Sequence, residues 1–143
     1  MEQNTVQFQH ETSVQIRFND IDLMGHVNNA TIQEYFDLGR MHYLRQVFGD
    51  RLFNGEATLI IASITTDFMV PVLLHDQVAV KTAIVHIGNK SLKMEQQIVD
   101  VANGTVKAIC RSVMVGVNKN SGNATPIVQE WRDAIGQMEQ RTF

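Results

Sequence analysis

The segment that most constrains the fold is a long apolar stretch with helical spacing, residues 31–48. Apolar positions recur there every three or four residues, as on one face of an α-helix: Ile32, Tyr35, Phe36, Gly39, Tyr43 and Val47. Four more apolar residues widen this face: Leu38, Met41, Leu44 and Phe48. We therefore expect a helix that other elements largely wrap. Gly39 costs about 1 kcal/mol inside a helix relative to alanine, which predicts a close approach to a sheet at that point.

The predicted helix has two candidate start signals. Thr31 and Glu34 fit a capping box, in which two side chains satisfy the free backbone amides of the first turn. Asn29 is the alternative N-cap residue. A segment with two glycines, residues 48–55, ends the helix.

Most of the remaining chain has β character. Apolar, β-branched or alternating runs predict strands at residues 4–18, 57–69, 77–88, 92–98 and 105–117. In the last of these runs, Ile109, Val113, Val115 and Val117 share one face. Asn103-Gly104 predicts a two-residue hairpin, because both residues tolerate positive φ. Pro126 is expected to open a second helix at its first position.

This order of elements predicts the fold class. A strand, a long helix, four strands and a short helix indicate an α+β domain in which a curved antiparallel sheet wraps the helix. A length of 143 residues predicts a single domain, residues 1–143. Two layers leave part of the sheet or helix surface for a second subunit to cover.

Composition excludes several classes of function. A net charge of −3 and a pI near 5.9 give no electrostatic footprint for nucleic acid. The N-terminus is polar and does not read as a signal peptide, and no run approaches the ~18 apolar residues of a membrane span. Cys110 is the one cysteine, so it has no intramolecular disulfide partner and is expected to be buried. We expect a cytoplasmic protein.

The candidate site is the loop between the first strand and the long helix, residues 17–29. Its polar and backbone-directing residues are Asp20, Asp22, Gly25, His26, Asn28 and Asn29. Loops held by rigid elements often carry chemistry. Two simpler readings stand beside a catalytic one. Asp20, Asp22 and His26 could ligate a divalent ion, although three groups are few, and the asparagines could merely cap the helix.

The loop carries a family resemblance. The pattern from Arg17 to Asn29, with Asp22 followed by Gly-His-Val-Asn-Asn, resembles the opening of the hotdog-fold acyl-CoA thioesterases, in the 4-hydroxybenzoyl-CoA thioesterase-like subgroup. Weaker matches follow at residues 67–71, 88–92 and 95–96. The resemblance implies a hotdog fold, an acyl-CoA substrate, homodimers that sometimes form tetramers, and active sites at the subunit interface. It implies no cofactor and no metal ion.

The resemblance also assigns roles within the loop. Asp22 occupies the catalytic carboxylate position, as nucleophile or as general base toward the thioester carbonyl. Gly25 is expected to let the backbone approach the substrate or to adopt positive φ. His26 and Asn29 are expected to position the carbonyl, the water or Asp22. Ile32 departs from the family, in which this position is often tyrosine. Asp20 is the less favoured catalytic acid.

For the nucleotide end of coenzyme A, the resemblance points to the turn at Lys90 and Ser91. Lys93, Arg111 and Lys119 are looser candidates, because cationic side chains suit phosphates. Two alternatives to acyl-CoA hydrolysis stay open. One is a non-catalytic acyl-CoA or acyl-carrier binding module on the same fold. The other is a thioesterase that acts on acyl-carrier protein.

Overall fold

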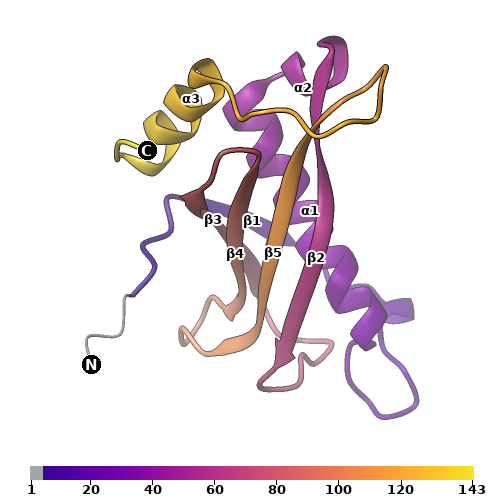
Figure 1. Cartoon of the computed structure of the whole chain (residues 1–143). Coiled ribbons are helices and arrows are strands. Elements are labelled where there is room, and N and C mark those ends of the chain that lie inside the picture. The colour runs from indigo at the N-terminus through magenta and orange to yellow at the C-terminus, as the bar shows by residue number, and fades with distance from the viewer. Residues whose placement is uncertain (1–4) are drawn as a thin grey trace.

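A five-stranded antiparallel sheet lies against one long helix in the computed structural model, which describes residues 5–143 (Figure 1). In chain order the elements are β1 (His10–Val14), the short 3-10 helix η1 (Phe18–Asp20), α1 (Asn29–Phe48), α2 (Arg51–Asn54), β2 (Ala57–Phe68), β3 (Val78–Ile87), β4 (Ser91–Asp100), β5 (Val106–Asn118) and α3 (Gln129–Glu139). The order of strands in the sheet is β1-β3-β4-β5-β2. The predicted α+β class and the wrapped helix are confirmed.

β2 is an edge strand of the sheet, and α1 lies over the strands toward the opposite edge. β3, β4 and β5 form the predicted meander, and β2 pairs only with β5. α1 packs mainly over β1, β3 and β4. The inner face of β2 therefore stays largely uncovered by the helix of its own chain.

Several predicted details of the local structure were wrong. The first strand covers only His10–Val14, and residue 4 of the predicted strand lies outside the described residues. Pro126 precedes its helix by three positions, since α3 begins at Gln129. Asn103-Gly104 does not make a two-residue hairpin. Asp100 donates its amide to the Thr105 carbonyl and accepts the Gly104 amide, so four residues form the loop, and only Gly104 has positive φ.

α1 starts two residues earlier than predicted. Its N-cap is Asn28, whose side chain accepts a hydrogen bond from the Ala30 amide at 2.8 Å. Neither the capping box at Thr31 nor Asn29 is the cap. The stronger local signal is an asparagine at the end of the polar loop, because its short side chain reaches back to the first-turn amides. Within residues 5–143, no helix has both the length and the apolar character to cross a bilayer.

The core lies between α1 and the inner face of the sheet. β5 contributes small side chains to it, including Ala108 and Cys110, and this burial raises the pKa of the Cys110 thiol. The predicted apolar face of β5 is real, but it is the half-exposed outer face of the sheet. α1 comes closest to the sheet over β3 and β4 rather than over β5.

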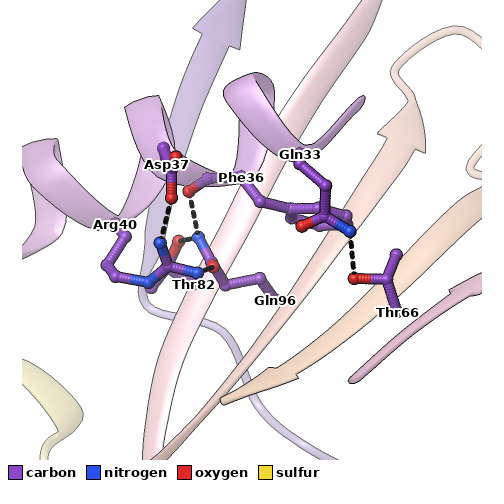
Figure 2. Close-up of polar contacts among 7 residues, drawn as sticks. All are labelled: Gln33, Phe36, Asp37, Arg40, Thr66, Thr82 and Gln96. Carbon is purple, nitrogen blue, oxygen red and sulfur yellow. Dashed lines mark hydrogen bonds and ion pairs between the residues drawn. The ribbon is translucent and has the colours of Figure 1, made fainter. Parts of the chain in front are cut away.

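That close approach is centred on Gly39. A Cβ placed there would lie 2.5 Å from Val80 Cγ1 and 3.2 Å from Gln96 Nε2. The buried Gln96 amide donates to the Phe36 carbonyl of α1 at 3.0 Å and to Thr82 Oγ1 at 3.0 Å, and it accepts from Arg40 Nη2 at 3.2 Å (Figure 2). The predicted close approach at Gly39 is confirmed, and it lets a polar side chain of the sheet hydrogen-bond directly to the helix backbone, which the sequence did not predict.

α3 packs against the C-terminal half of α1 through the buried carboxylate of Glu139. Tyr43 donates its hydroxyl to Glu139 Oε1 at 2.6 Å, and the Ile84 amide donates to the same oxygen at 3.1 Å. Burial raises the pKa of Glu139 despite these two donors. Trp131 and Ile135 complete the contact with the core.

Replacing Gly39 by alanine should destabilise the protein. The added methyl group costs about 1–3 kcal/mol of overpacking against Val80, which outweighs the ~1 kcal/mol of helix propensity that alanine adds. We expect a lower thermal unfolding midpoint. The control Glu34→Ala, on the exposed face of the same helix, should stay within about 0.5 kcal/mol of wild type. A higher midpoint for Gly39→Ala would show that the helix does not need this close approach.

Candidate active site

The loop before α1 is a short, tightly bonded hairpin. The Asp22 amide donates to the His26 carbonyl at 3.0 Å, and the Gly25 amide donates to the Asp22 carbonyl at 3.0 Å. Gly25 has a φ of +82°, a conformation that favours glycine, as the sequence predicted. The Val27 amide donates to the Val72 carbonyl and so fastens the loop beside the segment that follows β2. In Figure 1 the loop lies at the same end of the sheet as the end of β2.

Asp22 holds a partly exposed carboxylate at the start of α1. Its Oδ1 accepts the Met24 amide at 2.9 Å, and its Oδ2 lies 3.4 Å from the Asn28 side-chain nitrogen. Asn28 therefore caps the helix and touches Asp22 at once, a second role that sequence reasoning did not assign to it. The free first-turn amides of a helix favour negative charge near them, and the contact with Asn28 links the Asp22 carboxylate to the N-cap of α1.

Asp20, the other carboxylate of the loop, is buried and fully engaged. Tyr35 donates its hydroxyl to Asp20 Oδ2 at 2.6 Å, the Arg17 amide donates to the same oxygen at 2.9 Å, and the Asn28 amide donates to the Asp20 carbonyl. Burial opposes ionisation, but the donors outweigh it, so the pKa of Asp20 lies below its ordinary value. Burial and the neighbouring carboxylate raise the pKa of Tyr35 well above its usual range. Asp20 therefore anchors the loop to the helix.

A hollow of about 130 Å³, called here the loop pocket, opens beside this loop. His26, Asn29 and Ile32 line one side of it, residues 68–72 line another, and Lys107 and Ala108 of β5 close it. A cavity of about 150 Å³ holds a benzene ring in an engineered protein, so the loop pocket suits a small acyl group. Of residues 5–143, its lining includes His26 and Asn29 but not Asp22, which belongs to the same loop.

Lys107 is a site residue that the sequence did not reveal. It is buried in the loop-pocket wall, and its Nζ donates to the Pro71 carbonyl at 3.1 Å and pairs with Asp76 at 3.2 Å. A single lysine near the start of a strand gives no signal of its own. Only the fold brings it beside the segment that follows β2.

Lys90 and Ser91 do not meet the loop within one chain. Ser91 pairs with Val115, and Val115 pairs with Ile60 near the start of β2, whereas the loop pocket lies at Phe68. Eight strand residues at ~3.3 Å each separate these two levels by roughly 25 Å. The turn itself is well supported, because the Ile127 amide donates to the Asn89 carbonyl. Lys93 and Arg111 project from the outer face, where Arg111 pairs with Asp67 and Glu95.

The loop does not form a metal-binding group. Within residues 5–143, no cluster of three or more histidine, cysteine, aspartate or glutamate side chains has the arrangement to hold a metal ion. Asp20 is turned inward to Tyr35, so it does not join Asp22 and His26 around one point. The arrangement instead offers a carboxylate, a helix N-terminus and a small hollow, which together suit an acyl-transfer site.

Comparison with known proteins agrees with this class of site. The model of the Thioesterase-like superfamily matches residues 16–135, and the chain belongs to this family. An uncharacterised protein of Bacillus subtilis, YsmA, is 25% identical over 128 residues, which cover 90% of this chain and 86% of that protein. The fold is the hotdog fold, and the protein is a thioester hydrolase.

Solved structures extend the comparison. A Thermus thermophilus thioesterase, crystallised with coenzyme A and zinc, is 32% identical with a TM-score of 0.83, covering 97% of this chain and 100% of that chain. A predicted thioesterase from Bacillus stearothermophilus is 28% identical with a TM-score of 0.79, covering 94% and 96%. A 1,4-dihydroxy-2-naphthoyl-CoA thioesterase from Synechocystis is 17% identical with a TM-score of 0.77, covering 88% and 94%, which shows the shared fold alone.

Replacing Tyr35 by phenylalanine should loosen the loop and slow hydrolysis. Asp20 would lose its side-chain donor at a cost of about 1–3 kcal/mol, and a misplaced Asp22 should lower kcat/KM roughly 10–100-fold. Because the pKa of folded Asp20 is lowered, the pair stabilises the protein above the ordinary aspartate pKa of about 3.9, and this stabilisation is lost as pH falls through the folded value. The unfolding difference from wild type should therefore shrink at acid pH.

Tyr43→Phe is the matched control for this variant. It removes a hydrogen bond of the same length from a buried carboxylate at the far end of the same helix. It should lower stability without lowering kcat/KM. Equal losses of activity in the two variants would mean that Tyr35 acts only through global stability.

Proposed function

We propose that this thioesterase hydrolyses acyl-CoA and that Asp22 is the catalytic carboxylate. The observation that carries the proposal is the contrast within one loop. Asp20 is buried and accepts hydrogen bonds from Tyr35 and Arg17, whereas Asp22 is half-exposed near the start of α1 and accepts from Met24 and Asn28. The Thermus thermophilus relative with bound coenzyme A supports the choice of the CoA ester.

The chemistry needs an attacking oxygen and donors for the charge that develops on the carbonyl oxygen. The thiolate is a fairly good leaving group, so strong protonation of the leaving sulfur is not required. Asp22 either attacks the carbonyl carbon to form an anhydride, which water then opens, or removes a proton from an attacking water. First-turn amides of α1 and the Asn29 side chain supply donors for the oxyanion. His26 and Asn29 hold the acyl group in the loop pocket, and Gly25 lets the backbone bend around it.

A second copy of the chain completes the site in this proposal. β2 is a twelve-residue edge strand with Ile61, Ile64 and Phe68 between 40% and 50% exposed. An exposed apolar edge strand of this length invites pairing with another chain. Two-fold antiparallel pairing of β2 strands would bring the start of one strand beside the end of the other. That places Lys90 and Ser91 of the partner subunit on the side of the loop pocket, where they would meet the nucleotide end of coenzyme A.

Asp22→Asn and Asp22→Ala should each lower CoA release at least about 10²-fold while leaving the thermal unfolding midpoint and oligomeric state unchanged. The measurement is thiol release across short, medium, long and aromatic acyl-CoAs. Asp50→Asn is the matched control, since Asp50 is an exposed aspartate near the other end of α1 whose side chain caps nothing. Unchanged hydrolysis in both Asp22 variants would remove Asp22 from the mechanism.

Two assays of the wild-type protein distinguish acyl-CoA hydrolysis from the two alternative functions. Tight acyl-CoA binding without thiol release over hours would identify a binding module. Faster release from acyl-carrier protein than from the matching acyl-CoA would identify the carrier protein as the substrate.

Light scattering should give a native particle of at least twice the 16.1 kDa chain mass. Ile64→Glu would put like charges close together across the two-fold axis, so we expect it to give monomers and to lose hydrolysis. Val128→Glu, at a similarly exposed residue far from β2, should do neither. A monomeric wild type with full activity would contradict the shared site.

A further inference from the structure

A second hollow lies on the same face of the sheet as the loop pocket. It is about 470 Å³ and lies between the C-terminal half of α1 and the first half of β2; we call it the groove pocket. Met41 and Leu44 of α1, Phe53 of α2 and Ile61 of β2 form its apolar wall. Its volume is within the ~300–1,000 Å³ range of pockets for organic ligands, whereas the loop pocket falls well below that range.

The loop pocket and the groove pocket lie one after the other along α1 and β2. On α1, Ile32 belongs to the loop pocket and Arg40 to the groove pocket. On β2, Phe68 belongs to the loop pocket and Ile61 to the groove pocket. The pairing register puts Ile61 and Phe68 on the inner face of the sheet, opposite the buried Met114 and Ala108. A single groove between α1 and β2 therefore contains both.

One hydrogen bond crosses this groove between the two hollows. Gln33 on α1 donates its side-chain amide to Thr66 Oγ1 on β2 at 2.5 Å (Figure 2). Thr66 stands opposite Cys110 in the register, so its side chain lies on the inner face between the levels of Ile61 and Phe68. Gln33 lies between Ile32 and Arg40 on the helix. This bond therefore lies between the loop pocket and the groove pocket.

We propose that Gln33 and Thr66 form a partition that limits the length of the acyl group, and that the groove pocket is the apolar chamber behind it. With the bond in place, the loop pocket holds a small acyl group, such as a short chain or a single ring. With the bond removed, a longer aliphatic chain reaches the groove pocket and buries its methylenes there, at about 0.8 kcal/mol per CH₂ group. This inference rests on the proposed acyl-CoA substrate and names Gln33 as its specificity-determining residue.

Gln33→Ala is the direct test, since it removes both the donor and the bulk of the partition. We expect the ratio of kcat/KM for dodecanoyl-CoA to that for butanoyl-CoA to rise at least tenfold, with butanoyl-CoA changed by less than threefold. Thr66→Val, which keeps the volume and removes the acceptor, should give a smaller change in the same direction. Gln46→Ala, a glutamine further along α1 and outside both hollows, should leave the ratio unchanged.

A second substitution tests whether the groove pocket is the chamber that receives the longer chain. Met41→Trp, added to Gln33→Ala, should fill the groove pocket and return the ratio to the wild-type value. An unchanged ratio in a folded Gln33→Ala variant would overturn the partition. So would a Met41→Trp variant that loses long-chain turnover although Gln33→Ala has no effect, since the chain would then reach the chamber by another route.

Binding measurements test the partition independently of whether the protein hydrolyses acyl-CoA. Thioether analogues of butanoyl-CoA and dodecanoyl-CoA cannot be hydrolysed, and their dissociation constants are measured by titration calorimetry. Tighter binding of the long analogue to Gln33→Ala, by at least tenfold relative to wild type, supports the partition even if wild type releases no thiol. Equal affinities in the two proteins would contradict the partition even if wild type hydrolyses acyl-CoA.

Discussion

The hydrogen bonds of the buried Gln96 side chain, which Gly39 makes possible, set the geometry of the whole molecule. Gln96 is completely buried, and its amide reaches the Phe36 carbonyl only because no side chain stands between helix and sheet at Gly39. A buried amide with three partners fixes one position for the helix, because any shift leaves a polar atom unsatisfied. α1 is thereby held over β1, β3 and β4, and the inner face of β2 remains open beside it.

The groove between α1 and β2 follows from this off-centre position. A helix in the middle of the sheet would cover the inner face of β2 and leave no room for the loop pocket or the groove pocket. The buried Arg40 reinforces the arrangement, since its guanidinium pairs with Asp37 on one side and with Gln96 on the other (Figure 2). Removing a partner from such a buried charge is strongly destabilising, so the wall of the groove is not easily rebuilt.

Much of the fold could be predicted from local pattern. The wide apolar stripe of α1, the glycine at its centre and the β meander are properties of neighbouring residues, so periodicity revealed them. The sequence left the helix cap open, because two adjacent asparagines and a capping box compete within four positions, and only the backbone of the loop selects Asn28. The face of β5 that packs on the helix was missed because small residues fill it, while the larger Val113 and Val115 lie on the outer face.

Contacts between distant segments could not be predicted in this way. The bond between Gln33 and Thr66 joins residues 33 positions apart, and each residue alone is an ordinary polar side chain. Lys107 reaches the loop pocket only through the pairing of β5 with β2. The same limit applies to Lys90 and Ser91, for which the resemblance suggested a role but no local pattern gave the distance of roughly 25 Å along the strand.

In the mechanism we propose, the loop assigns one of its two carboxylates to structure and the other to chemistry. Asp20 receives its donors inside the protein, and the low pKa that results keeps it charged and bound to Tyr35. Asp22, two residues later, lies on the outer side of the hairpin, where the positive φ of Gly25 turns the chain back toward α1. Asp20 is only 5% exposed, so a substrate carbonyl or an attacking water does not reach its carboxylate. The anchoring of Asp20 is therefore what allows Asp22 to stay accessible while its backbone is held still.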